Sequence, residues 1–240
     1  MSSMFGGWRV WGAGLVAVLA AMVLTPPATA GAVLLGGGAA IHVGDVACTL
    51  TTIGHDDTGA LVGIASAHCG GPDAVVTIPG IAGPVGRVVR VNDTLDYAVV
   101  VFDADQITPI PDFAGFAIDG IGPPPRLRAP ACMQSGATGR TCFLIGGRGL
   151  IPDDWIISAI ECGTPDDTGA PVTVDDRLIG MIQGGLVPHN PFGRPCPDFL
   201  TGPPPVFPLG NRPKIVLMTV ILNDIEADGG PGAGFVPIGV

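Results

Sequence analysis

The chain has 240 residues, of which 38 are Gly and 25 are Pro, while 47% are apolar and only 13% are charged. The apolar fraction excludes a disordered chain, and the density of Gly and Pro excludes long helices and coiled coils. The formal net charge of −10 argues against a nucleic-acid partner, because few cations are present to neutralise phosphates. Short apolar strands joined by turns remain, which predicts an all-β sandwich or barrel.

The first 30 residues have the pattern of a secretory signal peptide. Arg9 is the only charged residue before Asp45, an apolar run extends from Val10 to Leu24, and Ala28-Thr29-Ala30 offers small residues to a signal peptidase. The run is shorter than the ~20 residues that a membrane span needs, which favours a cleaved signal at 1–30 over an uncleaved N-terminal anchor. We therefore expect a secreted, extracytoplasmic protein with no stable membrane span in its mature form.

Apolar, β-branched runs bounded by Gly, Pro, Asn or Asp follow the signal segment. These runs are Ile41–Ile53, which divides at Gly44-Asp45, then Ala60–Ala67, Val75–Ile78, Val85–Val91 and Tyr97–Phe102. Their spacing favours an antiparallel barrel over alternating strands and helices. Asp103–Pro130, with Pro at positions 123–125, predicts a linker. We accordingly expect an N-terminal domain at 31–120 and a C-terminal domain at 121–240.

The strand pattern resumes after the linker. The predicted strands are Cys142–Gly146, Trp155–Glu161, Pro171–Val174 and Leu178–Gln183. The Pro-rich stretch 188–213 is irregular, whereas Lys214–Ala227 carries apolar residues at helical spacing and predicts the one helix that follows the signal segment. A Gly/Pro-rich tail then completes the chain.

Six Cys follow the signal segment. They are Cys48, Cys69, Cys132, Cys142, Cys162 and Cys196. An even number of Cys in an exported chain predicts three disulfides, and the spacing by itself leaves their connectivity open. Zinc is the competing use of Cys, but no C-x-x-C pair is present and the Cys are too dispersed for a compact finger.

Three segments carry the chemistry. Ala65-Ser66-Ala67-His68-Cys69 ends an apolar run, Asp96 stands just before the run Tyr97–Phe102, and the third segment is Glu161–Pro171. They resemble, in this order, the T-A-A-H-C, N-D-[YI]-[AG] and A-C-x-x-x-G-D-S-G-G-P signatures of the chymotrypsin-like (trypsin-like) serine proteases. The third is most similar to the bacterial streptogrisin and α-lytic protease branch, and Thr168 stands where that branch has its nucleophilic Ser. The loop Cys132–Cys142 resembles the C-R-S-G-x-T-T-G-x-x-C loop of the same branch.

This resemblance implies two six-stranded antiparallel β-barrels and a C-terminal helix. It implies His68 as general base, Asp96 as its orienting partner and Thr168 as nucleophile. The backbone N–H groups of Asp166 and Thr168 would form the oxyanion hole. The implied disulfides are Cys48–Cys69, Cys132–Cys142 and Cys162–Cys196. No cofactor and no metal are expected; the partner is a peptide or protein, and the chain is expected to be a monomer.

Four positions around the implied site depart from the family pattern. Thr168 adds a methyl group to the nucleophile, and Asp166 replaces a Gly of the oxyanion hole. Met133 and Gln134 stand where the bacterial loop has the Arg that meets the residue at 167, and Gln183 replaces the Ser expected before Gly184-Gly185. Acyl transfer depends on well-placed donors, so these changes predict slow catalysis.

A second copy of the nucleophile string lies elsewhere in the chain. Asp56-Asp57-Thr58-Gly59-Ala60 repeats Asp166–Ala170 at a predicted hairpin turn, so the five letters alone are not specific. Paired Asp residues in turns, Asp56-Asp57 included, predict solvated side chains. His42, His55 and His189 match no metal signature and are interpreted as turn or loop residues.

Three functional hypotheses remain. The first is a secreted pseudoprotease that keeps a peptide-binding cleft but has degenerate or weak peptidase activity. The second is an active secreted endopeptidase of the serine type that uses Thr168 with His68 and Asp96. The third is a structural protein anchored in the envelope by its apolar N-terminus.

Overall fold

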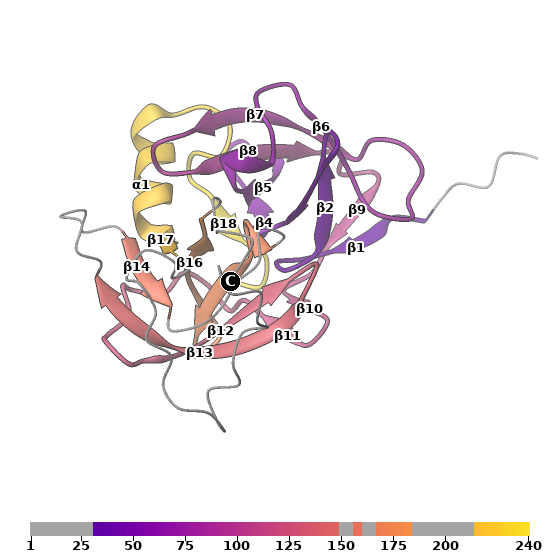
Figure 1. The fold of residues 1–240 in the computed structure, drawn as a ribbon. Helices are drawn as coiled ribbons and strands as arrows, with labels where there is room; N and C mark the ends of the chain where they lie inside the picture. Colours follow the sequence, from indigo (N-terminus) through magenta and orange to yellow (C-terminus); the bar gives the residue numbers. More distant parts are fainter. Residues whose placement is uncertain (1–30, 149–155, 160–166, 184–213) are drawn as a thin grey trace, which may run out of the picture. The chain divides into compact units, whose positions relative to one another are not determined.

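The computed structural model describes residues 31–148, 156–159, 167–183 and 214–240 (Figure 1). The elements in chain order are β1 (Val33–Leu35), β2 (Ala40–Val43), β3 (Val46–Thr49), β4 (Thr52–His55), β5 (Leu61–Ala65), the 3₁₀ turn η1 (Ala67–Cys69), β6 (Val75–Thr77), β7 (Gly86–Asn92), β8 (Tyr97–Phe102), β9 (Ile107–Pro109), β10 (Asp112–Phe113), β11 (Phe116–Ala117), β12 (Pro130–Ser135), β13 (Gly139–Arg148), β14 (Ile156–Ala159), β15 (Pro171–Val174), β16 (Arg177–Ile182), β17 (Lys214–Leu217), α1 (Met218–Asp228) and β18 (Val236–Pro237).

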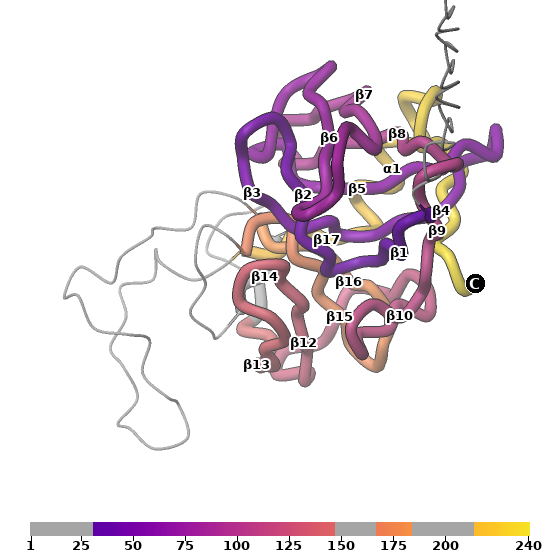
Figure 2. Tube along the Cα trace, turned by 90° about the vertical axis from the view of Figure 1, so that its right-hand side faces the viewer, coloured from indigo at the N-terminus to yellow at the C-terminus, as the bar shows by residue number. Residues whose placement is uncertain are grey.

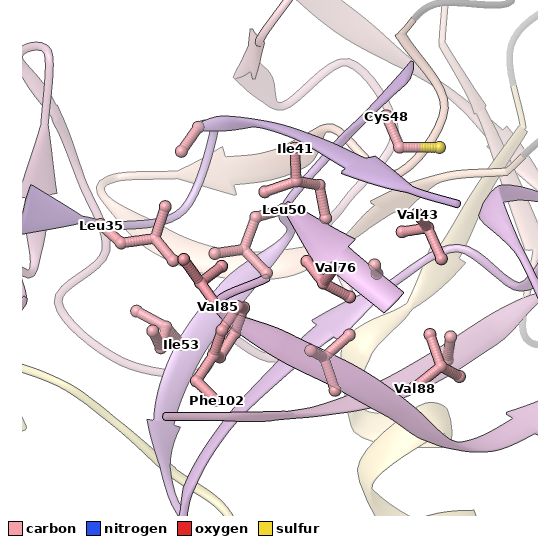
Figure 3. Close-up of a cluster of buried hydrophobic side chains, with 14 of the residues drawn as sticks. Leu35, Ile41, Val43, Cys48, Leu50, Ile53, Val76, Val85, Val88 and Phe102 are labelled. Atoms are coloured by element: carbon pink, nitrogen blue, oxygen red, sulfur yellow. The ribbon is translucent and has the colours of Figure 1, made fainter. Parts of the chain in front are cut away.

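An eight-stranded antiparallel sheet forms the N-terminal half, in the order β18-β4-β5-β8-β7-β6-β2-β3. Its central strand β8 is buried on both faces, because Ala98, Val100 and Phe102 face one apolar cluster while Tyr97 and Val99 face another. This explains why β8 is an almost continuous apolar run rather than an alternating one. Figure 3 shows part of the first cluster, in which residues of β2, β4 and β8 converge with those of β6 and β7.

A closed antiparallel barrel, β12-β13-β14-β17-β16-β15, forms the C-terminal half. Inward-facing side chains fill it, as is usual for a barrel of this size. These include Met133, Phe143, Ile145, Val172, Ile179, Ile215 and Leu217. Figure 2 shows β12, β13 and β15 grouped apart from β2, β3, β6 and β7. The predicted all-β double-barrel fold is confirmed. The C-terminal barrel has the six strands predicted, whereas the N-terminal sheet has eight rather than six, and one of them is β18 from the C-terminal end of the chain.

A further apolar cluster joins the two sheets to helix α1. Ile64 and Val99 of the first sheet, Met181 and Val216 of the barrel, and Ile221 of the helix all belong to it. The prediction of a helix over Lys214–Ala227 is wrong at its start, because residues 214–217 form β17. These four residues close the barrel between β14 and β16, and that pairing outweighs their helical spacing.

The predicted linker 103–130 also contains short strands. The strand β9 pairs in parallel with β1, and β10 pairs with β11. No helix in the described ranges is long and apolar enough to cross a membrane. The predicted signal segment 1–30 and the Pro-rich stretch 188–213 lie outside the described residues.

Asp56 hydrogen-bonds both to residues of its own turn, the Asp-Asp-Thr-Gly-Ala copy at 56–60, and to the segment that follows helix α1. Its Oδ1 atom accepts hydrogen bonds from Thr58 N at 3.0 Å, Thr58 Oγ1 at 2.7 Å and Ala60 N at 3.0 Å, and its Oδ2 accepts one from Gly232 N at 3.2 Å. The prediction of a solvated side chain is therefore wrong for Asp56, which is only 7% exposed. Burial acts to raise its pKa, but the hydrogen bonds from Thr58, Gly232 and Ala60 together outweigh burial and lower the pKa below its ordinary value.

Helix α1 is held against the first sheet by polar contacts. Asp224 Oδ2 accepts hydrogen bonds from Tyr97 Oη at 2.6 Å and from Asn92 Nδ2 at 2.8 Å. The Arg90 guanidinium donates to the carbonyl oxygens of Ile225 and Gly229 at the helix C-terminus, where a cation is favourable. Burial, followed by the hydrogen bond to Asp224 and the charge of Asp224, raises the pKa of Tyr97 to about 12.

This raised pKa predicts a loss of stability in alkali. The phenol ionises near pH 10.0 in the unfolded chain and at about 12 in the folded one, so between these values the unfolded state binds fewer protons. The free energy of unfolding is therefore expected to fall as the pH rises through this window, and Tyr97→Phe should remove that part of the fall. Because the sequence contains one Tyr, its ionisation can be followed by ultraviolet absorbance. Native-state ionisation near pH 10.0 would contradict the prediction.

Candidate active site

His68 lies in the 3₁₀ turn that follows β5. Ser66 leaves the strand with extended backbone angles and caps this turn, because its Oγ atom accepts a hydrogen bond from His68 N at 3.2 Å. The next residue, Cys69, forms a disulfide with Cys48 of β3. The turn is thus fixed at both sides of His68, while the His68 side chain stays 53% exposed.

Asp96 ends the turn between β7 and β8. The Oδ1 atom of Asn92 accepts hydrogen bonds from the backbone N–H groups of Thr94 and Leu95, both at 3.0 Å, which tightens this turn. Asp96 itself has a φ of 55° and is completely buried. The pairing of β5 with β8 then sets Asp96 beside the turn of His68, and Ala67 N donates to Asp96 O at 3.2 Å.

The carboxylate of Asp96 receives donors from the His68 turn. Its Oδ1 atom lies 2.5 Å from His68 Nδ1, 3.1 Å from His68 N and 2.7 Å from Ser66 Oγ. An ionised carboxylate at Nδ1 keeps the ring proton there, so Nε2 can accept a proton from elsewhere. The pair can therefore act as a general base toward a nearby hydroxyl group.

Thr168 lies in a turn that contacts both halves of the fold. Its carbonyl oxygen accepts a hydrogen bond from Thr49 N at 3.2 Å, and Thr51 Oγ1 donates to Gly169 O at 2.6 Å. Gly169 has a φ of 82°, and a Cβ atom placed on it would lie 2.4 Å from Thr49 O and 3.4 Å from Ser66 N. The Thr168 turn therefore lies next to Ser66, the residue that caps the His68 turn.

Asp167 is buried and makes a contact that the sequence did not reveal. Its Oδ1 atom accepts a hydrogen bond from Thr138 Oγ1 at 2.6 Å. Thr138 stands at the tip of the β12–β13 hairpin, where Ser135 Oγ accepts from the N–H groups of Ala137 and Thr138. The Thr138 hydroxyl thus donates to the carboxylate at position 167, which the Arg of the resembling bacterial loop would meet. A single Thr in a turn gives no sequence signal for such a role.

The two residues at the expected Arg position have other environments. Met133 packs in the core of the barrel, and Gln134 is buried with its amide directed to Ser135 O at 3.4 Å. Gln183, where a Ser was expected, directly follows β16, and its backbone N–H donates to Lys214 O at 2.9 Å. Its buried Oε1 atom has no hydrogen-bond partner among the described residues.

The structure contains two of the three predicted disulfides, Cys48–Cys69 and Cys132–Cys142. Cys162 and Cys196, together with Asp166 of the implied oxyanion hole and His189, lie outside the described residues. His42 lies on β2 and His55 is exposed at the end of β4. No group of three or more His, Cys, Asp or Glu that could hold a metal ion occurs in the described part of the chain.

No family model and no curated protein matches the sequence. Solved structures do match it. Thermobifida fusca protease A has 16% identity and a TM-score of 0.62 over 85% of this chain and 100% of that chain. An α-lytic protease homologue, N4, has 16% identity and a TM-score of 0.60 over 85% and 99% of the two chains.

A third structure, a Nocardiopsis protease, has 17% identity and a TM-score of 0.58 over 80% of this chain and 96% of that chain. The match to all three thus extends over nearly the whole of each protease. Identities this low establish the fold alone. Together with the two sheets and the single helix described above, these matches show that this chain has the fold of the chymotrypsin-like serine proteases.

Proposed function

We propose that this protein is an exported homologue of trypsin-like serine proteases that binds peptide or protein chains and hydrolyses them weakly. In this proposal His68 is the base, Asp96 orients it and Thr168 is the nucleophile. The observation that carries the proposal is the 2.5 Å contact between His68 Nδ1 and the buried Asp96 carboxylate. Burying a carboxylate costs free energy, and here its partner is an imidazole that is 53% exposed, an arrangement suited to proton transfer.

The chemistry and surroundings of Thr168 support the proposal that hydrolysis is slow. The Cβ of Thr168 carries a methyl group that restricts χ1 and occupies space beside the hydroxyl. Thr168 is 6% exposed, and its turn is fixed by Thr49 and Thr51, so the turn has little room to move the methyl group aside. The resemblance aligns Asp166 with a Gly of the oxyanion hole, and a carboxylate at that position would oppose stabilisation of the anion that develops during acyl transfer.

A second candidate is an efficient endopeptidase with the same three residues. The hydrogen bond from Thr138 to Asp167 favours it, because it supplies a partner at the position where the sequence suggested that one was missing. The structural role in the envelope depends on residues 1–30, which lie outside the described part of the chain.

Reaction of the purified protein with a fluorophosphonate, read by intact mass, tests the proposal. We expect a slow, stoichiometric adduct that is absent in Thr168→Ala and formed at least about a hundred times more slowly in His68→Ala. Thr58→Ala is the matched control, since Thr58 occupies the same place in the repeated string and should leave the adduct unchanged.

The outcomes separate the candidates. A rapid adduct together with rapid peptide turnover would favour the efficient endopeptidase. An adduct that persists in Thr168→Ala would assign the reaction to another residue. No adduct on the unmodified protein, even after prolonged exposure, would overturn the proposed hydrolysis.

A further inference from the structure

We propose that Ser66 is a positioning residue for the pair formed by His68 and Asp96. Its hydroxyl group holds the Asp96 carboxylate in the orientation that contacts His68 Nδ1. The catalytic consequence of this role rests on the proposed function, but the orientation itself can be measured without any turnover.

One hydroxyl group links the two partners. Ser66 Oγ donates to Asp96 Oδ1 at 2.7 Å and accepts from His68 N at 3.2 Å. The same backbone N–H also lies 3.1 Å from Asp96 Oδ1. Each of these three groups, the Ser66 hydroxyl, the His68 backbone N–H and the Asp96 carboxylate, is thus hydrogen-bonded to the other two. They lie beside the 2.5 Å contact between His68 Nδ1 and Asp96 Oδ1.

A hydrogen bond from Ser66 matters because the Asp96 carboxylate can otherwise rotate about its side-chain torsion. The χ2 torsion of an Asp has a broad, two-fold preference, so the backbone alone does not decide where Oδ1 points. Asp96 also has a φ of 55°, a sparsely populated backbone conformation that persists only where surrounding contacts hold it. Ser66 and Asp96 are both completely buried, so water does not easily replace the hydroxyl as a donor.

The position of Ser66 follows from the fold. Ala65 pairs with Ala98 in the β5–β8 ladder, so the residue after Ala65 lies beside the start of β8, where Asp96 is. The hydroxyl of this residue is therefore within hydrogen-bond distance of the Asp96 carboxylate, at 2.7 Å.

The Nδ1–H resonance of His68 in the NMR spectrum of the full protein tests this role. With four His in the sequence, the signal can be assigned through His68→Gln. We expect Ser66→Ala to shift this resonance and to accelerate exchange of its proton with water by about tenfold or more, the effect of losing one hydrogen bond to a charged group. Ser66→Thr, which keeps the hydroxyl, should restore the signal.

Thr138→Val is the matched control. It also removes a hydroxyl donor from a buried carboxylate, that of Asp167, and should leave the His68 signal unchanged. An unchanged signal in Ser66→Ala, equal changes in both variants, or absence of the signal in the unmodified protein would each overturn the proposal. So would a Ser66→Ala variant that fails to fold when Thr138→Val folds, because Ser66 would then be a structural residue.

The fluorophosphonate reaction distinguishes this proposal from the proposed function. If the unmodified protein does not react but the His68 signal responds to Ser66→Ala as expected, the proposed hydrolysis fails and the role of Ser66 stands. If the protein reacts and Ser66→Ala changes neither the rate nor the signal, the reverse holds.

Discussion

Replacing Asp166 by Gly and Thr168 by Ser in the same chain is expected to raise the rate of peptide hydrolysis by a factor of about 10²–10³, the usual contribution of one oxyanion-hole donor. The first change restores the Gly that the resembling proteases have at this position of the oxyanion hole, and so removes a carboxylate that would oppose the developing anion. The second removes the methyl group from the nucleophile. The hydrogen bonds from Thr49 and Thr51 go to the carbonyl oxygens of Thr168 and Gly169, which the second change leaves in place.

The controls for this experiment are the two single variants and the double variant that also carries His68→Ala. Each single change is expected to give less than the pair, because donor placement and nucleophile access limit the same step. Adding His68→Ala to the double variant should return the rate to that of the unmodified protein or below. Rates of hydrolysis of a panel of short peptides provide the measurement. A double variant no faster than the unmodified protein would mean that acyl transfer is limited by something other than these two residues.

Gly169→Ala is expected to destabilise the protein by about 2–5 kcal/mol. An Ala at a φ of 82° costs ~1–2 kcal/mol by itself. The added Cβ would also lie 2.4 Å from Thr49 O, which is backbone and cannot move aside without displacing β3. Overpacking of this kind adds ~1–3 kcal/mol. The free energy of unfolding, measured with denaturant, reports the sum.

The repeated string provides the matched control. Gly59 occupies the same place in Asp56–Ala60, has a φ of 80°, and a Cβ atom there would meet nothing within 4 Å. Gly59→Ala should therefore cost only the ~1–2 kcal/mol of the backbone conformation. Equal costs for the two variants would show that the close approach of the Thr168 turn to Thr49 contributes nothing to stability.

Much of the fold was predictable because it is encoded locally. The runs Tyr97–Phe102 and Pro171–Val174 form strands with the predicted bounds, since β-branched residues between turn residues favour extended backbone. The segment 214–217 was predicted wrongly because its structure is decided by distant strands and not by its local sequence. Its four residues fit a helix in spacing, and only the open edges of β14 and β16 make them a strand.

The candidate site shows the same division. His68, Asp96 and Thr168 could be named as candidates because each stands in a short segment that resembles a family signature. Ser66 and Thr138 could not be assigned their contacts, because their carboxylate partners are 30 and 29 residues away and a Ser or Thr in a turn has many ordinary uses. The contact of Thr51 with Gly169 spans 118 residues, and the bond of Gly232 to Asp56 spans 176.

The two copies of Asp-Asp-Thr-Gly-Ala separate what the sequence determined from what the tertiary structure decided. In both copies the sequence determined a tight turn with a Gly at positive φ, because only Gly adopts that conformation without cost. Space around Gly59 is open, whereas Gly169 contacts the backbone of Thr49. That difference arises because Thr49 and Thr51, more than a hundred residues away in the chain, hydrogen-bond to Thr168 and Gly169. These contacts hold the second copy against the first sheet beside Ser66.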